Sequence, residues 1–212
     1  MKVSSELTWS LEIGSGIFWT LVYILIIRRG FYDKTYGMPI AALCANISWE
    51  FIFSFMIPHG PPQNYVNVVW FIFDLVIIFQ TLRSGRAVFE PSRLFYPAFL
   101  LGLVTSFGVI LAITYEFSDR DGKYAAFGQN LMMSVLFIAM LLKRESLSGQ
   151  SIYIALFKLL GTVLPSILFF LRFPGSVLLN FLYVAIFVFD AIYLAMLYVK
   201  HRELGINPWT RF

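Results

Sequence analysis

The stretch FYPAFLLGLVTSFGVILAITY, residues Phe95–Tyr115, carries no charged side chain along its whole length. A bilayer core of roughly 30 Å is crossed by about 20 helical residues, so this segment is long enough to span it. The composition of the whole chain agrees, because 59% of its residues are hydrophobic and only 13% are charged. In a soluble domain about a quarter of the residues are charged. The sequence therefore predicts an integral membrane protein built from helices.

Six more segments on either side of that stretch are similarly apolar, and glycine, proline and charged residues separate them. The predicted spans are Leu11–Ile27, Met38–Ile57, Val66–Leu82, Phe95–Tyr115, Tyr124–Leu142, Ile152–Leu171 and Val177–Val199. The first and third spans are short, and Arg28-Arg29-Gly30 is expected to end the first. No stretch between spans is long enough for a second domain. We therefore expect an all-α bundle of seven transmembrane helices that forms one domain over residues 1–212.

Lysine and arginine residues are shared unequally between the two ends of such a bundle. One end has Lys2, Arg120, Lys123 and Arg172. The other end has Arg28, Arg29, Lys34, Arg83, Arg86, Arg93, Lys143, Arg144, Lys200, Arg202 and Arg211. Because basic loops stay in the cytoplasm, the N-terminus is predicted to lie outside or in the lumen and the C-terminus in the cytoplasm. The basic residues follow the ends of the spans and form no single stripe, so we predict no nucleic-acid partner.

A few ionisable residues lie inside the predicted spans, where a charge is costly and usually functional. Glu50 belongs to the segment Asn46-Ile47-Ser48-Trp49-Glu50-Phe51, and Asn46 lies four residues before it on the same helix face. A carboxyl buried in an apolar wall tends to keep its proton, and a neutral carboxylic acid is what general acid catalysis needs. The alternative is an interhelical hydrogen bond that holds two spans together.

The other intramembrane charges also have two interpretations each. Asp190 lies deep in the last span, three residues before Tyr193, and is either a second carboxyl of the site or a structural hydrogen-bonding group. Asp74, one turn after Trp70, is either a third member of the site or a packing partner. Lys158 lies near the cytoplasmic end of its span, so its stem is expected to extend to the headgroups. The alternative for this lysine is an ion pair with a carboxylate.

The remaining motifs restrict the chemistry. His59 and His201 lie outside the predicted spans and Cys44 is the single cysteine, so we predict no metal site in the bundle. The chain has no Walker loop, dinucleotide fingerprint or nucleophile elbow. A dry, aromatic-lined cavity with two or three carboxyls fits proton-initiated chemistry on a lipophilic substrate, and it fits proton-coupled transport equally well. Pro62-Gln63 is faintly similar to a motif of seven-span solute transporters, but it has no counterpart in the second half of the chain.

Several of these residues together resemble a known family. Tyr36-Gly37-Met38-Pro39, the segment from Asn46 to Phe51 and the intramembrane Asp190 are similar to the small integral-membrane terpene cyclases. Those enzymes serve fungal meroterpenoid and indole-diterpene pathways and have bacterial relatives. The ending Gly205-Ile206-Asn207-Pro208-Trp209 is similar as well.

The resemblance implies a seven-helix enzyme that works without a metal or another cofactor. Its substrate would be a lipophilic prenyl chain attached to an aromatic or indole head, and protonation of an epoxide or terminal alkene would start the cyclisation. The family's two essential acids match Glu50 and Asp190. We expect five more residues to bind the substrate: Asn46, Trp49, Asp74, Trp70 and Tyr193. The resemblance does not distinguish a bacterial inner membrane from an endoplasmic reticulum, and it leaves the oligomeric state open.

Overall fold

The computed structural model describes residues 4–89 and 91–212, and within these ranges the fold is all-helical, without a β-strand. The long helices are α1 (Ser5–Tyr32), α2 (Ile40–Phe51), α3 (Gln63–Ser84), α4 (Phe95–Glu116), α5 (Lys123–Arg144), α6 (Ile152–Arg172) and α7 (Val177–Glu203). A π-helical segment, Ile52–Met56, continues α2, and the single turns Gly85–Ala87, Ser92–Leu94 and Pro208–Thr210 are 3-10 helical. The prediction of an all-α bundle is confirmed.

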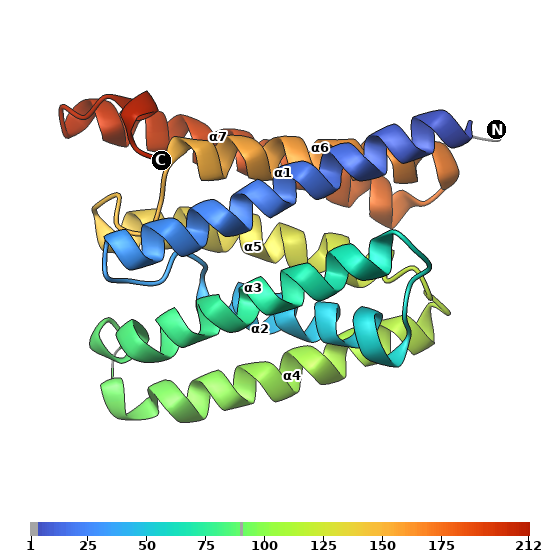
Figure 1. Cartoon of the computed structure of the whole chain (residues 1–212), viewed down its shortest axis with the longest axis horizontal. Helices are drawn as coiled ribbons and strands as arrows, with labels where there is room; N and C mark the ends of the chain where they lie inside the picture. Colours follow the sequence, from blue (N-terminus) through green and yellow to red (C-terminus); the bar gives the residue numbers. More distant parts are fainter. Residues whose placement is uncertain (1–3, 90) are drawn as a thin grey trace.

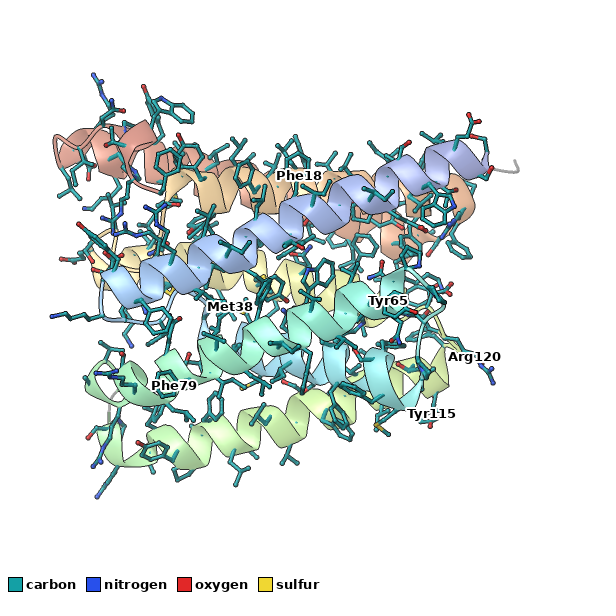
Figure 2. The ribbon with its side chains drawn as sticks, in the orientation of Figure 1. Phe18, Met38, Tyr65, Phe79, Tyr115 and Arg120 are labelled. Carbon is teal, nitrogen blue, oxygen red and sulfur yellow. The ribbon has the colours of Figure 1, made fainter. Side chains whose placement is uncertain are left out.

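The helices run back and forth along the long axis of the molecule. In Figure 1 the N-terminus and the C-terminus therefore lie at opposite ends of the bundle. Figure 2 places Tyr115 and Arg120, at the end of α4 and in the following loop, at the same end as the N-terminus. Six of the helices are long and apolar enough to cross a membrane, whereas α2 with its π-helical segment, Ile40–Met56, is shorter.

The prediction that Arg28-Arg29-Gly30 ends the first span is wrong, because α1 continues to Tyr32. The helix also begins earlier, at a cap in which Ser4 Oγ accepts a hydrogen bond from the Leu7 backbone N–H at 3.3 Å. Gly30 serves close packing instead of a turn, since a β-carbon at this position would collide with the side chain of Gln80 in α3.

The centre of the bundle is α2, which packs against α3, α4 and α5. Every residue from Ala42 to Glu50 is buried. A helix that is covered on all sides belongs to the core of a large bundle. At the edge of the bundle α4 has the opposite character, because Leu100, Leu101 and Val104 are 63%, 67% and 63% exposed. Such apolar residues suit contact with lipid, whereas Ala42–Glu50 of α2 lie in the protein interior.

A proline inside α6 helps to fasten α1 to the bundle. Pro165 has no N–H, so it cannot donate the usual helical hydrogen bond to the carbonyl of Gly161. Ser15 Oγ of α1 donates to that carbonyl at 2.8 Å and satisfies it. The contact fixes the two helices at the wall of the cavity described next.

Candidate active site

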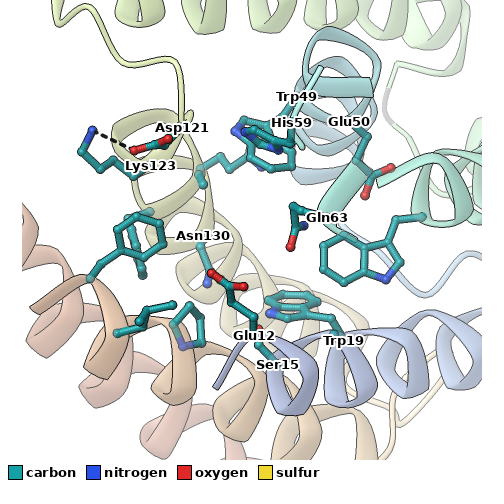
Figure 3. Close-up of a pocket in the computed structure, with 18 of the residues that line it drawn as sticks. Glu12, Ser15, Trp19, Trp49, Glu50, His59, Gln63, Asp121, Lys123 and Asn130 are labelled. Carbon is teal, nitrogen blue, oxygen red and sulfur yellow. Dashed lines mark ion pairs between the residues drawn. The ribbon is translucent and has the colours of Figure 1, made fainter. Parts of the chain in front are cut away.

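A cavity of about 380 Å³ lies between α1, α2, α3, α5 and α6, towards the end of the bundle that holds the N-terminus. Its mouth is polar: Glu12, His59, Asp121, Lys123 and Arg172 line it. Figure 3 shows Asp121 and Lys123 on one side of the cavity, His59 close to Trp49, and Glu12 close to Trp19. Charged and aromatic side chains therefore line the same cavity.

Three tryptophans from three helices form the aromatic wall: Trp19 of α1, Trp49 of α2 and Trp70 of α3. Trp49 Nε1 donates a hydrogen bond to the Gly122 carbonyl at 3.0 Å, and Trp70 Nε1 donates to Thr20 Oγ1 at 3.1 Å. These hydrogen bonds fix the orientation of two of the indoles, and their N–H groups bond to the protein and not to a molecule in the cavity. Indole faces attract cations, so this wall suits a positively charged intermediate.

Glu50 lies on the wall of the cavity within a network of side chains. The Tyr23 hydroxyl donates a hydrogen bond to Glu50 Oε1 and accepts one from Asn46 Nδ2. Asn46 Nδ2 also lies 3.3 Å from Glu50 Oε1 and 3.2 Å from Asp74 Oδ2, so its second N–H lies between the two carboxyls and can be donated to one of them. Gln129 Nε2 donates to Asn46 Oδ1 at 3.4 Å, which fixes the orientation of that amide. The predicted helix-face pairing of Asn46 with Glu50 is confirmed.

No cation balances this carboxyl pair among the residues that the structure describes. Glu50 is 1% exposed and Asp74 is fully buried, and neither makes an ion pair with a lysine, an arginine or a histidine in the described ranges. Glu50 Oε2 and Asp74 Oδ1 receive no hydrogen bond from an N–H or hydroxyl donor there, and the two carboxyls are close enough to share a proton with each other. Two unpaired charges in a dry interior would be costly. The arrangement is therefore suited to hold a proton that can be given to a guest.

Asp190 has a different environment. Lys158 Nζ lies 2.7 Å from Asp190 Oδ1, and both side chains are buried. The same ammonium donates to Asn130 Oδ1 at 3.0 Å and to Ser134 Oγ at 2.7 Å. The prediction that Lys158 extends to the headgroups is wrong, because these three oxygens satisfy its ammonium inside the bundle. The alternative, an ion pair with a carboxylate, is correct.

Asp190 does not line the cavity that contains Glu50. It borders a separate groove of about 390 Å³ between α6 and α7, and its Oδ2 has no hydrogen-bond partner among the described residues. Asn130 does line the cavity, and it accepts a hydrogen bond from Lys158. Its amide nitrogen donates to Thr162 Oγ1 at 2.9 Å. Asp190 is thus connected to the cavity wall through Lys158 and Asn130.

The other predicted substrate contacts are distributed unevenly. Asn46, Trp49 and Trp70 line the cavity, whereas Asp74 lies behind Asn46 and is not part of the wall. Tyr193 is buried elsewhere: its hydroxyl donates to Gln150 Oε1 at 2.9 Å.

Tyr23 and His59 are cavity residues that the sequence did not point to. Asn67 Nδ2 lies 3.0 Å from His59 Nδ1 and also donates to the Phe53 carbonyl at 3.3 Å, so Nδ1 is the acceptor. Burial lowers the pKa of His59, and the nearby Asp121 acts in the opposite direction. No sequence signal marks either residue, because their partners come from helices and loops that only the fold brings together.

Metal ligands are not clustered in the described part of the chain. No three or more His, Cys, Asp or Glu side chains lie close enough together there to hold a metal ion. Beside the tryptophan wall of the cavity the polar groups include the Glu50 carboxyl and the Tyr23 phenol, held by the Asn46 amide.

A membrane-embedded helical bundle that holds buried carboxyls beside an aromatic cavity is equipped for acid chemistry on lipophilic molecules. Sequence comparison gives the family. The chain belongs to the Pyr4-like transmembrane terpene cyclases, whose family model matches residues 3–203.

Named relatives support this membership. The chain is 33% identical over 189 residues to the Pyr4-family terpene cyclase mfmH of Annulohypoxylon moriforme, and the match covers 84% of this chain and 78% of the relative. It is 33% identical over 166 residues to the terpene cyclase macJ of Penicillium terrestre, with 74% and 64% covered. It is 27% identical over 179 residues to the terpene cyclase pyr4 of Aspergillus fumigatus, with 81% and 73% covered. No solved structure matches the chain significantly.

Proposed function

We propose that this protein cyclises a prenylated aromatic or indole substrate by protonating an epoxide or terminal alkene, without a metal. The observation that carries the proposal is Glu50, a buried carboxyl on the wall of an aromatic-lined cavity with no cation partner in the described residues. Membership of a cyclase family favours this proposal over the transporter alternative.

In the proposed reaction Glu50 gives its proton to the epoxide oxygen or the alkene. For an epoxide, the carbon–oxygen bond then breaks with its electron pair on oxygen, and the π electrons of the next double bond form a carbon–carbon bond to the cationic carbon. The indoles of Trp19, Trp49 and Trp70 stabilise the cation, each by roughly 0.5–2 kcal/mol. The last cation loses one proton, so the product is an isomer of the substrate.

Asp190 is proposed as the second acidic residue of the site. The two carboxyls differ in their surroundings, since Lys158 pairs with Asp190 and no cation pairs with Glu50. When two carboxyls in one enzyme have such different environments, they usually have different roles. We assign the proton donation to Glu50, and we assign to Asp190 the orientation of the cavity wall through Lys158 and Asn130.

The same proposal includes the membrane topology. We propose that all seven helices cross the bilayer, with the N-terminus outside or in the lumen. The segment Ile40–Met56 is short for a span, but it lies inside the bundle, where protein and not lipid surrounds it. The mouth of the cavity would then face the lumenal or external side.

The test uses purified protein in micelles, in buffer that contains a strong chelator. Wild type should convert a farnesylated phenol epoxide, or a related member of a small substrate panel, into a cyclic isomer of unchanged mass. Glu50→Gln keeps the size and hydrogen-bonding capacity of the side chain but has no acidic proton, so conversion should be lost. Asp190→Asn should lower conversion by roughly 10²-fold, because a small displacement of the cavity wall can cost about that much in rate.

Several results would contradict the proposal. Near-normal turnover by Glu50→Gln would show that Glu50 is not the proton donor. Loss of wild-type activity in chelator, with recovery on adding Mg²⁺, would place the reaction in a metal-dependent class. Equal turnover by wild type and Asp190→Asn would remove Asp190 from the mechanism.

A further inference from the structure

The hydrogen bonds around Glu50 distinguish its two oxygens. Oε1 accepts from the Tyr23 hydroxyl, and Asn46 Nδ2 lies 3.3 Å from the same oxygen. Oε2 is buried and receives no hydrogen bond from an N–H or hydroxyl donor among the described residues. A neutral carboxyl has one acceptor oxygen and one O–H donor. The oxygen that already accepts hydrogen bonds is therefore the carbonyl, and the proton belongs on Oε2.

The direction of the Tyr23 hydrogen bond follows from its second partner. Asn46 Nδ2 donates to the Tyr23 oxygen, and an amide nitrogen cannot accept a proton. The Tyr23 hydrogen must then be donated elsewhere, and Glu50 Oε1 is the acceptor that the structure gives it. The orientation of the Asn46 amide is also fixed, because its oxygen accepts a hydrogen bond from Gln129 at 3.4 Å and its nitrogen lies 3.2 Å from Asp74 Oδ2.

The aromatic ring of Tyr23 is held in a fixed orientation by its neighbours. It is 1% exposed, and it stacks on Trp70 with ring centroids 6.0 Å apart and an interplanar angle of 24°. The ring of Phe73 lies 5.9 Å away on the neighbouring turn of α3. The hydroxyl therefore reaches Glu50 from a fixed direction, and the ring borders the cavity beside the tryptophan wall.

We propose that Tyr23 is the positioning residue of the reaction: its hydroxyl occupies Oε1 of Glu50 and so directs the acidic proton to Oε2, for delivery to the substrate. This inference rests on the proposed function. In the transfer the Oε2–H bond breaks, its electron pair stays on Oε2, and the proton forms a bond to the epoxide oxygen or the alkene carbon. The new carboxylate keeps the hydrogen bond from Tyr23, which stabilises its charge as it develops.

The first test compares Tyr23→Phe with Tyr153→Phe, a matched control that also removes one hydrogen bond donated by a tyrosine hydroxyl, to the Trp209 carbonyl far from Glu50. Turnover of the substrate that wild type converts is measured in micelles. Tyr23→Phe should lower kcat by roughly 10–100-fold with KM little changed, since a hydrogen bond to a charged group is lost in the transition state. Tyr153→Phe should leave both constants unchanged.

The second test reads the hydrogen bond directly and needs no turnover. Infrared spectroscopy of wild type should show the carbonyl stretch of a protonated carboxyl that disappears in Glu50→Gln. In Tyr23→Phe this band should move to higher frequency, because the carbonyl oxygen has lost a donor. If Tyr23→Phe does not accumulate, fluorotyrosine at position 23, a stronger donor, should move the band to lower frequency.

The outcomes separate this inference from the proposed function. An unmoved carbonyl band, a wild-type kcat in Tyr23→Phe, or a rise in KM alone would overturn the positioning role while the cyclase assignment stands. If wild type converts no substrate of the panel, the proposed function fails, and the infrared bands still decide whether Tyr23 orients Glu50.

Discussion

Glu50 and Asp190 each carry a carboxyl inside an apolar helix, but their partners differ. Glu50 lies beside the phenol of Tyr23 and the amide of Asn46, whereas Asp190 pairs with the ammonium of Lys158. The sequence could reveal the carboxyls because a charge within an apolar run stands out. It could not reveal their partners, since Tyr23 lies 27 positions before Glu50 and Lys158 lies 32 positions before Asp190. Which long-range pair forms depends on helix rotation and packing, and neither is encoded in a local pattern.

The buried ion pair leads to a prediction about stability. Lys158→Met leaves Asp190 buried without its cation, and breaking such a pair from one side typically costs about 3–5 kcal/mol. The melting temperature in micelles should therefore fall clearly. The double variant Lys158→Met with Asp190→Leu should recover part of the loss, because it removes the stranded charge.

The matched control is Lys200→Met. Lys200 pairs with Glu203 at 3.3 Å on the surface, where both side chains are partly exposed. Exposed pairs contribute little, so this variant should melt close to wild type. Equal melting of wild type and Lys158→Met would mean that the pair does not exist in the folded protein.

At the scale of helices, the predicted spans agree with the observed ones most closely where a turn sequence bounds them. The last two spans begin where α6 and α7 begin, at Ile152 and Val177. The sequence did not predict the continuation of α1 through Gly30, because glycine and paired arginines commonly end a helix and only the contact with Gln80 explains their place here. It also did not predict the π-helical segment after Glu50, whose hydrogen bonds depend on local strain and packing.

The loop before α5 gives a prediction at this scale. Gly122 has φ +63°, and a β-carbon there would collide with the ring of Phe53. Its carbonyl also accepts the hydrogen bond from Trp49, so this residue fixes one wall of the cavity. Gly122→Ala should destabilise the fold by at least about 1–2 kcal/mol, the usual cost of left-handed backbone for a residue with a side chain.

Gly175→Ala is the control for that substitution. Gly175 lies in the loop between α6 and α7, and a β-carbon there would meet no atom within 4 Å. Thermal unfolding of the two variants should therefore differ, with only Gly122→Ala clearly below wild type. Identical melting temperatures would show that the Phe53 ring and the loop can move to accommodate the β-carbon without destabilising the fold.

At the scale of the whole molecule, charge and chain direction together define a topology. The helices alternate in direction, so the N-terminus and the loops at the cavity mouth lie at one end and the C-terminus at the other. Among the described residues, the end with the C-terminus carries eleven lysine and arginine residues against three at the opposite end, Arg120, Lys123 and Arg172, with Lys158 inside the bundle. Translocating so many basic residues is disfavoured, which predicts a cytoplasmic C-terminus and a cavity mouth on the lumenal or external side.

This topology can be measured with a pair of reporters fused after Phe212. A reporter that works only in the cytoplasm should be active, and one that works only after export should be silent. A third fusion, in the Arg120 loop, should give the opposite pattern, because Figure 2 places that loop at the other end of the bundle. If the C-terminal and Arg120 fusions report the same side, one of α5, α6 and α7, the three helices between the two fusion sites, does not cross the membrane as proposed. If both patterns are reversed, the fusion sites still lie on opposite sides of the membrane, but the C-terminus lies on the lumenal or external side, against the prediction from the lysine and arginine distribution.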